Sequence, residues 1–565
     1  MKRIICLMIS LGMFSLGLAA ATSSSKLSPD LRNLPPTQKV NVIIQFNIPS
    51  SGATSAVTAQ GAALNKAFKH LNGAAFTLPA GILNFVAQLP FVKYISLDRP
   101  IRGHLQFAEP AINANIALSY GYDGTGIGVA VVDSGVYASH PDLQSAGSPS
   151  HSRVVYSESF VANDSSTADA YGHGTHVAGI LGGNGASSSG PNALYTFKGI
   201  APNVNIVSFR VLDATGSGTD SALIAAIDEA INLKSTYNIR VLNLSAGRAV
   251  QESYTVDPLC QAVEAAWNAG ITVVVAAGND GRDNSMSTAG YSTITAPGND
   301  PFVITVGAMK DMGTIDRSDD LIGSYSSKGP TLLDQIAKPD LVAPGNEIVS
   351  ALAPNSTLVN TYPANLVPMS SYLTSGGSGN SPYYFSLSGT SMATPMVSGS
   401  VALMLQKDPT LTPDTIKARL MKTAAKNFPG SSTVVDPTTG AIYTDYYDLF
   451  TVGAGYLDAW AALSDTSDVV PAGQNANSPS VVYSASTNTV SLVSGTNIVW
   501  GSNIVWGSNI VWGSNVVSGT NIVWGSNIVW GSSALQGFNI VWGSNIVWGS
   551  NVDFFAQSVE VAGEK

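Results

Sequence analysis

The sequence is poor in cysteine, and this shortage excludes a protein held together by internal disulfides. Of its two cysteines, Cys6 lies in an apolar segment that we expect to be removed, so the mature chain keeps Cys260 alone. Stability must then come from burial of apolar side chains, which a chain of 565 residues can supply. Cys260 itself is expected to be a small packed hydrophobe.

Charged residues are also scarce, at 11% of the chain against about 25% in typical soluble domains. Acidic residues outnumber basic ones by 37 to 27, which gives a formal net charge of −10, and the basic residues form no cluster. Proteins that bind nucleic acid or anionic lipid need positive charge to attract phosphate groups. The composition therefore predicts no nucleic-acid partner.

Apolar runs long enough to span a bilayer as a helix are missing as well. Residues 1–21 combine Lys2 and Arg3, an apolar stretch at 4–18 and small residues at 19–21, the pattern of a cleavable secretory signal. A membrane anchor is the alternative, but the apolar stretch is shorter than the roughly 20 residues that a spanning helix needs. We expect cleavage near Ala21 and a secreted, extracellular protein.

Two motifs that mark common hydrolases are also lacking. No His-Glu-x-x-His occurs, and although His173 and His176 are three apart, no third metal ligand is apparent. We therefore expect His176 to be a packed helix residue. No Gly-x-Ser-x-Gly elbow occurs either, and its absence disfavours a lipase or esterase.

What is present is a set of three polar segments: Val-Val-Asp-Ser-Gly-Val at 131–136, His-Gly-Thr-His-Val-Ala-Gly at 173–179 and Gly-Thr-Ser-Met-Ala-Thr-Pro at 389–395. They supply a carboxylate, an imidazole and a hydroxyl, on Asp133, His173 and Ser391. A serine hydroxyl becomes an effective nucleophile when an imidazole takes its proton, and a carboxylate can fix the imidazole tautomer. The segments predict a catalytic triad.

The predicted elements place these groups suitably. The apolar run at 127–132 predicts a buried parallel strand, which puts Asp133 at the carboxyl end where open α/β sheets build their sites. His173 begins a predicted helix rich in small residues. Ser391 lies at the start of another predicted helix, where free N–H groups favour a developing negative charge. Pro395 is tolerable there if it falls in the first turn.

The order Asp133, His173, Ser391 is that of subtilisin, and with these motifs the sequence resembles the subtilisin-like (subtilase) serine proteases over roughly residues 105–465. The resemblance implies an endopeptidase that cleaves proteins or peptides through an acyl-enzyme on Ser391. It implies that Asn279 donates to the oxyanion. It also implies two walls of a substrate pocket, Ser245, Ala246 and Gly247 on one side and Ala276, Ala277 and Gly278 on the other.

The resemblance implies no required cofactor but leaves a structural calcium site open, since many subtilases bind this ion. Asp142 lies near one ligand position of the family. The partner loop at 182–192 is long and rich in serine and glycine, and it departs from the usual ligand pattern. No metal residues are assigned.

The fold expected for residues 106–465 is α/β, a subtilisin-like parallel sheet with helices on both faces. Apolar strands at 127–132, 204–211, 240–244, 271–275 and 302–306 alternate with helices at 173–182, 220–233, 258–269 and 391–406.

Residues 22–105 predict a small α+β unit, with a strand at 40–46 and a helix at 56–71, that resembles the inhibitory prodomain of subtilases. We expect self-cleavage between about Arg102 and Asn113. A permanent extra domain is the alternative.

Residues 466–490 are rich in Ser, Asn, Thr and Pro, which predicts a linker. Asn-Ile-Val-Trp-Gly-Ser then recurs from Asn497 to Ser550, and residues 491–556 predict a β-rich repeat region before a tail at 557–565. Within each unit Ile and Trp share one face of a short strand and Gly-Ser-Asn favours a turn, so the units can stack as a β-solenoid or meander. The tryptophans pack the core of this stack, or they bind a glycan or cell-surface partner or self-associate.

The predicted function is a secreted serine endopeptidase made as a self-processed precursor. The alternative is a catalytically weak cell-surface binding or structural protein that acts through its tryptophan repeats. A hydrolase of esters is a third candidate, because the same triad would serve it.

Overall fold

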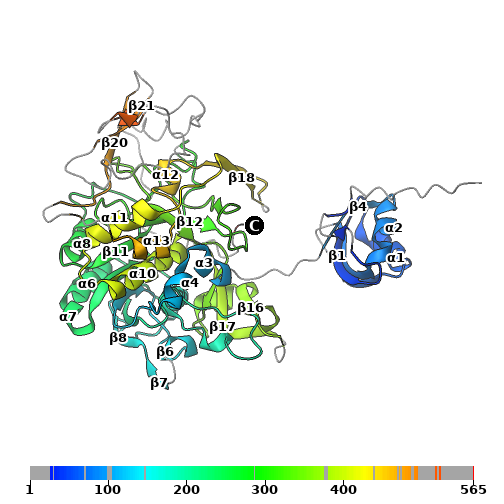
Figure 1. Ribbon diagram of the computed structural model, residues 1–565, viewed down its shortest axis with the longest axis horizontal. Helices are drawn as coiled ribbons and strands as arrows, with labels where there is room; N and C mark the ends of the chain where they lie inside the picture. The colour runs from blue at the N-terminus through cyan, green and yellow to red at the C-terminus, as the bar shows by residue number, and fades with distance from the viewer. Residues whose placement is uncertain are drawn as a thin grey trace, which may run out of the picture. The chain divides into compact units, whose positions relative to one another are not determined.

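The computed structural model divides the chain into two compact units, Met1–Ile101 and Arg102–Lys565 (Figure 1). It describes residues 26–28, 31–32, 34–68, 72–97, 105–145, 148–285, 287–374, 379–436, 439–466, 470, 474–484, 489–493, 516–517, 521–522 and 564. The predicted signal at 1–21 lies outside the described residues. So does the repeat region, apart from residues 491–493 and the short strands β22 (Val516–Val517) and β23 (Asn521–Ile522).

The first unit is an antiparallel sheet of four strands in the order β2-β3-β1-β4. Side chains of β1 alternate, with Val40, Val42, Ile44 and Phe46 buried, so one face of the sheet packs on the core. Its strands and helices are β1 (Lys39–Phe46), α1 (Ser50–Thr58), β2 (Ala63–Ala67), β3 (Gly73–Pro79), α2 (Leu83–Gln88) and β4 (Val92–Leu97), with a 3₁₀ turn at Ala80–Ile82.

The helix predicted at 56–71 is wrong in its bounds. Helix α1 ends at Thr58, and the chain then turns at Gly61, whose φ of 90° suits glycine, before entering strand β2. The predicted strand at 40–46 is confirmed by β1.

The second unit is built on a mainly parallel sheet in the order β13-β12-β11-β10-β5-β9-β8, with β14 also parallel to β12 and β13 antiparallel. Its strands are β5 (Gly128–Asp133), β8 (Val154–Ser159), β9 (Asn205–Arg210), β10 (Ile239–Leu244), β11 (Thr272–Ala276), β12 (Ile304–Lys310), β13 (Leu321–Ile322) and β14 (Leu341–Pro344). Every residue of β5, β11 and β12 is buried, so both faces of the sheet are covered. The predicted parallel sheet is confirmed.

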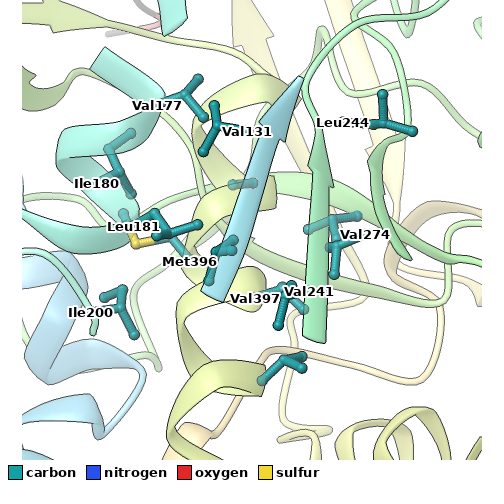
Figure 2. Packing of buried hydrophobic residues seen from close by; sticks show 14 of the residues in the cluster. Val131, Val177, Ile180, Leu181, Ile200, Val241, Leu244, Val274, Met396 and Val397 are labelled. Carbon is teal, nitrogen blue, oxygen red and sulfur yellow. The ribbon is translucent and has the colours of Figure 1, made fainter. Parts of the chain in front are cut away.

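Two helix groups cover this sheet, α5 (His173–Gly182) with α10 (Thr390–Lys407), and α6 (Asp220–Asn232) with α8 (Pro258–Asn268). Helix α10 is buried from Thr390 to Leu405, and the polar side chains in this part are small hydroxyls. Figure 2 shows its Met396 and Val397 against apolar side chains of α5, β5 and β10. The four predicted helices are thus confirmed.

Smaller elements surround this core. A three-stranded sheet has the order β15-β17-β16, and the hairpins β18-β19, β20-β21 and β6-β7 lie apart from it. The elements are α3 (Leu105–Ala111), α4 (Ala114–Ser119), β6 (Gln144–Ser145), β7 (Ser148–Ser152), α7 (Lys234–Tyr237), β15 (Ile348–Ala351), α9 (Thr357–Thr361), β16 (Leu366–Pro368), β17 (Asn380–Leu387), α11 (Pro413–Thr423), β18 (Ser431–Val435), β19 (Ile442–Tyr446), α12 (Leu449–Val452), α13 (Ala459–Ser464), β20 (Ser480–Ser484) and β21 (Thr489–Val493). Among the helices that the structure describes, none is long and apolar enough to cross a bilayer.

Candidate active site

Asp133 and His173 meet at the carboxyl edge of the parallel sheet. Asp133 is the last residue of β5 and His173 the first of α5, and His173 Nδ1 lies 2.8 Å from Asp133 Oδ1 and 2.9 Å from Oδ2. Gly174 permits this approach, because a Cβ there would lie 2.2 Å from the carbonyl oxygen of Gly135 and 3.0 Å from Asp133 Cβ. The predicted strand-end carboxylate and helix-start imidazole are therefore brought together.

The charge on Asp133 tunes the imidazole. Burial of His173 opposes the imidazolium, but the charge and hydrogen bond of Asp133 outweigh it with help from the charge of Asp169, and the pKa of His173 is raised. His173 Nε2 is buried and has no hydrogen-bond partner among the described residues. A basic nitrogen is thus left available on the side of the ring away from Asp133.

Asp169 is a buried residue next to this pair that sequence reasoning missed. Its carboxylate accepts hydrogen bonds from Gly172 N–H at 2.6 Å, Thr175 N–H at 2.8 Å and Thr175 Oγ1 at 2.6 Å, so it fixes the start of α5 on either side of His173. It also accepts from Ser134 Oγ at 2.8 Å, next to Asp133. An acidic residue shortly before a predicted helix is an N-terminal signal that could have found it.

Ser391 is the second residue of α10. Its hydroxyl donates to the carbonyl oxygen of Ser245 at 3.2 Å, and both residues are buried. Pro395 lies inside α10 beyond the first turn, so the expectation that it falls in that turn is wrong. The helix tolerates it because the carbonyl of Ser391, which loses its N–H partner at Pro395, accepts a hydrogen bond from Ser245 Oγ at 3.1 Å.

Asn279 lies beside the start of α10. Its Oδ1 accepts hydrogen bonds from Thr390 N–H at 2.9 Å and Thr390 Oγ1 at 3.0 Å, which fixes the orientation of the amide. Its Nδ2 is buried and, within the part of the chain described, has no acceptor. A buried amide donor without a partner is available for an acceptor that arrives with a substrate.

The six predicted pocket residues follow neighbouring parallel strands at the same edge of the sheet. Strands β10 and β11 pair with Leu244 opposite Val275. Ser245–Gly247 follow β10, Ala276 ends β11, and Ala277 and Gly278 come after it, all of them buried. The strand ends therefore bring both predicted walls to the edge that carries Asp133.

His176 is a packed helix residue, as predicted. It is fully buried in α5, and its Nε2 lies 3.0 Å from Ile348 O and 3.1 Å from Phe385 O. Burial and then the charge of His173 lower its pKa to about 3, so the ring is neutral and donates to these carbonyls.

The surroundings of Asp142 do not fit a calcium ion. Its Oδ1 accepts from Ser187 N–H at 2.7 Å and its Oδ2 from Tyr384 O–H at 2.6 Å, so both carboxylate oxygens are already engaged. The described residues contain no group of three or more His, Cys, Asp or Glu side chains that could hold a metal.

A cation is nevertheless present beside Asp142, the guanidinium of Arg153. Burial lowers the pKa of Arg153 to about 10, although the charge of Asp142 acts in the opposite direction. The side chain is therefore charged at neutral pH. It donates to three main-chain carbonyls, Asp142 O at 2.7 Å, Gln144 O at 3.2 Å and Val204 O at 3.2 Å. Arg153 thus uses oxygen acceptors of the kind that calcium requires.

Comparison with known proteins agrees with this geometry. The model of the Subtilase family matches residues 124–455. Serine protease AprX of Bacillus subtilis (strain 168) is 36% identical over 349 residues, 60% of this chain and 71% of the relative. Subtilisin E of Bacillus subtilis (strain 168) is 33% identical over 420 residues, 73% of this chain and 92% of the relative. Extracellular serine proteinase of Thermus sp. (strain Rt41A) is 32% identical over 379 residues, 65% of this chain and 75% of the relative.

Proposed function

The chain belongs to the subtilase family and is a subtilisin-like serine endopeptidase, and we propose that Asp133, His173 and Ser391 form its catalytic triad. One observation carries the proposal. His173 is held at Nδ1 by a buried carboxylate, 2.8 Å away, while its Nε2 has no hydrogen-bond partner in the described chain. An imidazole in this state is ready to take a proton from a nucleophile.

In the proposed mechanism, Ser391 Oγ attacks the carbonyl carbon of the scissile peptide bond while His173 Nε2 takes the hydroxyl proton. Asp133 keeps the Nδ1–H tautomer and stabilises the imidazolium. His173 then protonates the leaving amine, the C–N bond breaks, and an acyl-enzyme remains on Ser391. A water molecule then attacks the ester carbon while His173 Nε2 takes a proton from the water. His173 gives this proton to Ser391 Oγ as the C–O bond breaks and the acid product leaves.

The oxyanion that forms in both steps needs donors, and we assign Asn279 Nδ2 and the N–H of Ser391 to it. Support comes from the unpartnered buried amide of Asn279 and from the first turn of α10, where N–H groups have no partner inside the helix. Loss of one such donor costs about 10²–10³ in kcat, a magnitude measured in subtilisin itself.

We also propose a substrate class and a substrate pocket. The substrates are proteins or peptides, as the endopeptidase activity requires. The residue before the scissile bond would lie between Ser245–Gly247 and Ala276–Gly278, whose small buried residues support a pocket open to large side chains.

The first unit serves, in this proposal, as an inhibitory prodomain that the enzyme itself removes. Support comes from its compactness and its separate apolar core. The expected cleavage window runs from about Arg102 to Asn113, and it lies within the second unit, whose later window residues are bonded to the rest of that unit. Ile112 is buried there with its carbonyl accepting from Ala459 N–H at 2.8 Å, and Asn113 Nδ2 donates to Asp458 Oδ2 at 2.7 Å. A cut at or before Leu105 spares these contacts.

We further propose that the enzyme is secreted. The relative named extracellular serine proteinase supports this location, as does the signal pattern at 1–21. Binding of glycans, cell surfaces or other copies through the tryptophan repeats stays a prediction. Deletion of residues 491–565 tests it, since a binding role requires that retention on cells or glycans falls.

The decisive experiment compares the chain without residues 1–21 as wild type and as Ser391→Ala, following mass and casein hydrolysis together. We expect the wild type to lose its first unit and digest casein, and the variant to do neither. Processing and hydrolysis that persist in Ser391→Ala would contradict the triad. Casein hydrolysis without loss of the first unit would contradict only the prodomain.

A further inference from the structure

Glu564 is held in a polar site of the second unit. The residues that form this site lie far from Glu564 in the sequence. The Glu564 carboxylate accepts hydrogen bonds from Ser324 N–H at 2.9 Å and Ser324 Oγ at 2.5 Å. Arg282 Nη2 lies 3.1 Å from Oε1, and Lys310 Nζ lies 3.6 Å from Oε2. One carboxylate therefore meets two cations and two donors of a single serine.

The main chain of Glu564 is bound as well. Asn346 Nδ2 donates to Glu564 O at 2.8 Å, and Glu564 N–H donates to Asn346 Oδ1 at 2.9 Å. The Asn346 amide thus pairs with both polar groups of one residue as a neighbouring strand would. Because the main chain is fixed in this way, the distance to Ser324 and Arg282 selects a side chain of the length of glutamate.

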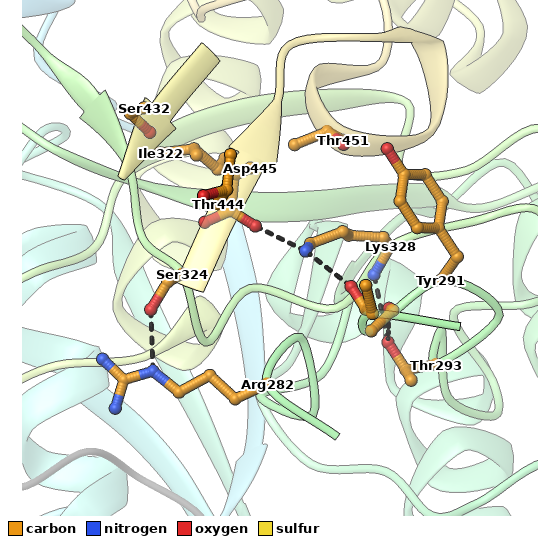
Figure 3. Close-up of polar contacts among 12 residues, drawn as sticks. Arg282, Tyr291, Thr293, Ile322, Ser324, Lys328, Ser432, Thr444, Asp445 and Thr451 are labelled. Atoms are coloured by element: carbon orange, nitrogen blue, oxygen red, sulfur yellow. Dashed lines mark hydrogen bonds and ion pairs between the residues drawn. The ribbon is translucent and has the colours of Figure 1, made fainter. Parts of the chain in front are cut away.

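The site is built and held by other contacts. Figure 3 shows Arg282 Nε donating to Ser324 Oγ, at 2.7 Å, which directs the serine proton to Glu564. Arg282 also pairs with Asp436 at 3.1 Å and lies over the Tyr443 ring, 4.8 Å from its centroid. The side chains of Glu564 and Lys310 are only 2% and 4% exposed. Charged groups this deeply buried are stable only when they are paired.

A second attachment lies upstream of the repeats. Ala337 N–H donates to Pro479 O at 2.9 Å and Val481 N–H to Gln335 O at 2.7 Å, while Ser478 Oγ donates to Asp340 Oδ1 at 2.6 Å. This part of the predicted linker therefore bonds to the second unit. Val481 and Glu564, which flank every tryptophan repeat in the sequence, are therefore each bonded to residues between Arg282 and Asn346.

We propose that Arg282, Lys310, Ser324 and Asn346 form a glutamate-binding site that captures Glu564 of the same chain and fastens the segment after the tryptophan repeats to the protease. The ligand class is a peptide strand with one glutamate side chain.

Hydrogen exchange of the Ser324 amide tests the proposal, because this N–H donates directly to Glu564. The full chain without residues 1–21, carrying Ser391→Ala against self-digestion, is compared with the same chain carrying Glu564→Ala. We expect exchange at Ser324 to become about tenfold faster or more, since a hydrogen bond to a charged group is lost. The Val131 amide of β5 serves as an internal reference and should not change.

Glu560→Ala is the matched control, since it removes the other glutamate of the same tail, and it should leave Ser324 protected. Glu564→Asp should expose Ser324 almost as Glu564→Ala does, because the shorter side chain does not reach. The Ser324 amide should exchange at the same rate at low and high protein concentration, because the proposed binding occurs within one chain. Unchanged exchange in Glu564→Ala, an equal effect of Glu560→Ala, or loss of protection on dilution would each overturn the proposal.

Discussion

Ser245 and Ser391 exchange two hydrogen bonds across the boundary between strand β10 and helix α10. Ser245 Oγ donates to Ser391 O at 3.1 Å, and Ser391 Oγ donates to Ser245 O at 3.2 Å. The first bond replaces the one that Pro395 cannot give. The second engages the hydroxyl of Ser391, the proposed nucleophile. A single residue thus supports both the helix and the nucleophile.

The first prediction concerns Ser245→Ala. The change leaves the buried Ser391 carbonyl without its donor, so we expect the free energy of unfolding to fall by about 1–3 kcal/mol in chemical denaturation. The hydroxyl of Ser391 keeps its acceptor, the Ser245 carbonyl, so kcat should fall far less than in Ser391→Ala.

Ser208→Ala provides the control for this prediction. Ser208 is buried, and its Oγ has no hydrogen-bond partner within the described chain. Its loss should therefore leave stability nearly unchanged or raise it. Equal destabilisation by the two serine variants would show that the bond to Ser391 O is unimportant.

The second prediction concerns pH. In the proposed mechanism His173 must be neutral to accept a proton, and its pKa is raised, so kcat/KM should fall as the pH drops through a value above that of a free histidine. The charge of Asp169 contributes to this rise, and Asp169→Asn should therefore move the acid limb of kcat/KM to lower pH. Asp164→Asn changes an exposed carboxylate of the same loop and should not move it. An acid limb that moves to higher pH in Asp169→Asn would contradict the predicted direction of the shift.

The sheet and the main helices of the second unit were predictable because buried parallel strands form continuous apolar runs and helices begin at recognisable residues. Strand β5 and helix α5 illustrate this, since the predictions at 127–132 and 173–182 match Gly128–Asp133 and His173–Gly182. The same runs placed Asp133 and His173 at the ends where the structure has them.

Other contacts were beyond local reasoning. The pattern at 56–71 suited a helix, but pairing with β3 turned Ala63–Ala67 into strand β2, because tertiary context overrides propensity. The position of Asp169 before a predicted helix was a usable signal, but its hydrogen bond from Ser134, 35 residues earlier, could not be read from the sequence. Glu564 meets Asn346 from 218 residues away, and no sequence pattern marks such a pair.

The third prediction concerns Asn279→Ala. The variant removes the unpartnered Nδ2 donor, which we assign to the oxyanion, so kcat should fall by about 10²–10³ with little change in KM. Steady-state kinetics on a peptide substrate measures both. A rise in KM at constant kcat would assign Asn279 to substrate binding instead.

The final prediction concerns calcium. Asp142 already accepts from Tyr384 and Ser187, and Arg153 already donates to the nearby carbonyls, so a chelator should leave the Tm unchanged. Tyr384→Phe should instead lower the free energy of unfolding by about 1–3 kcal/mol, since it leaves a buried carboxylate oxygen without its donor. Tyr383→Phe, at a neighbouring exposed tyrosine, is the control and should have little effect. A Tm that falls on chelation and recovers with added calcium would place the ion in this protein after all.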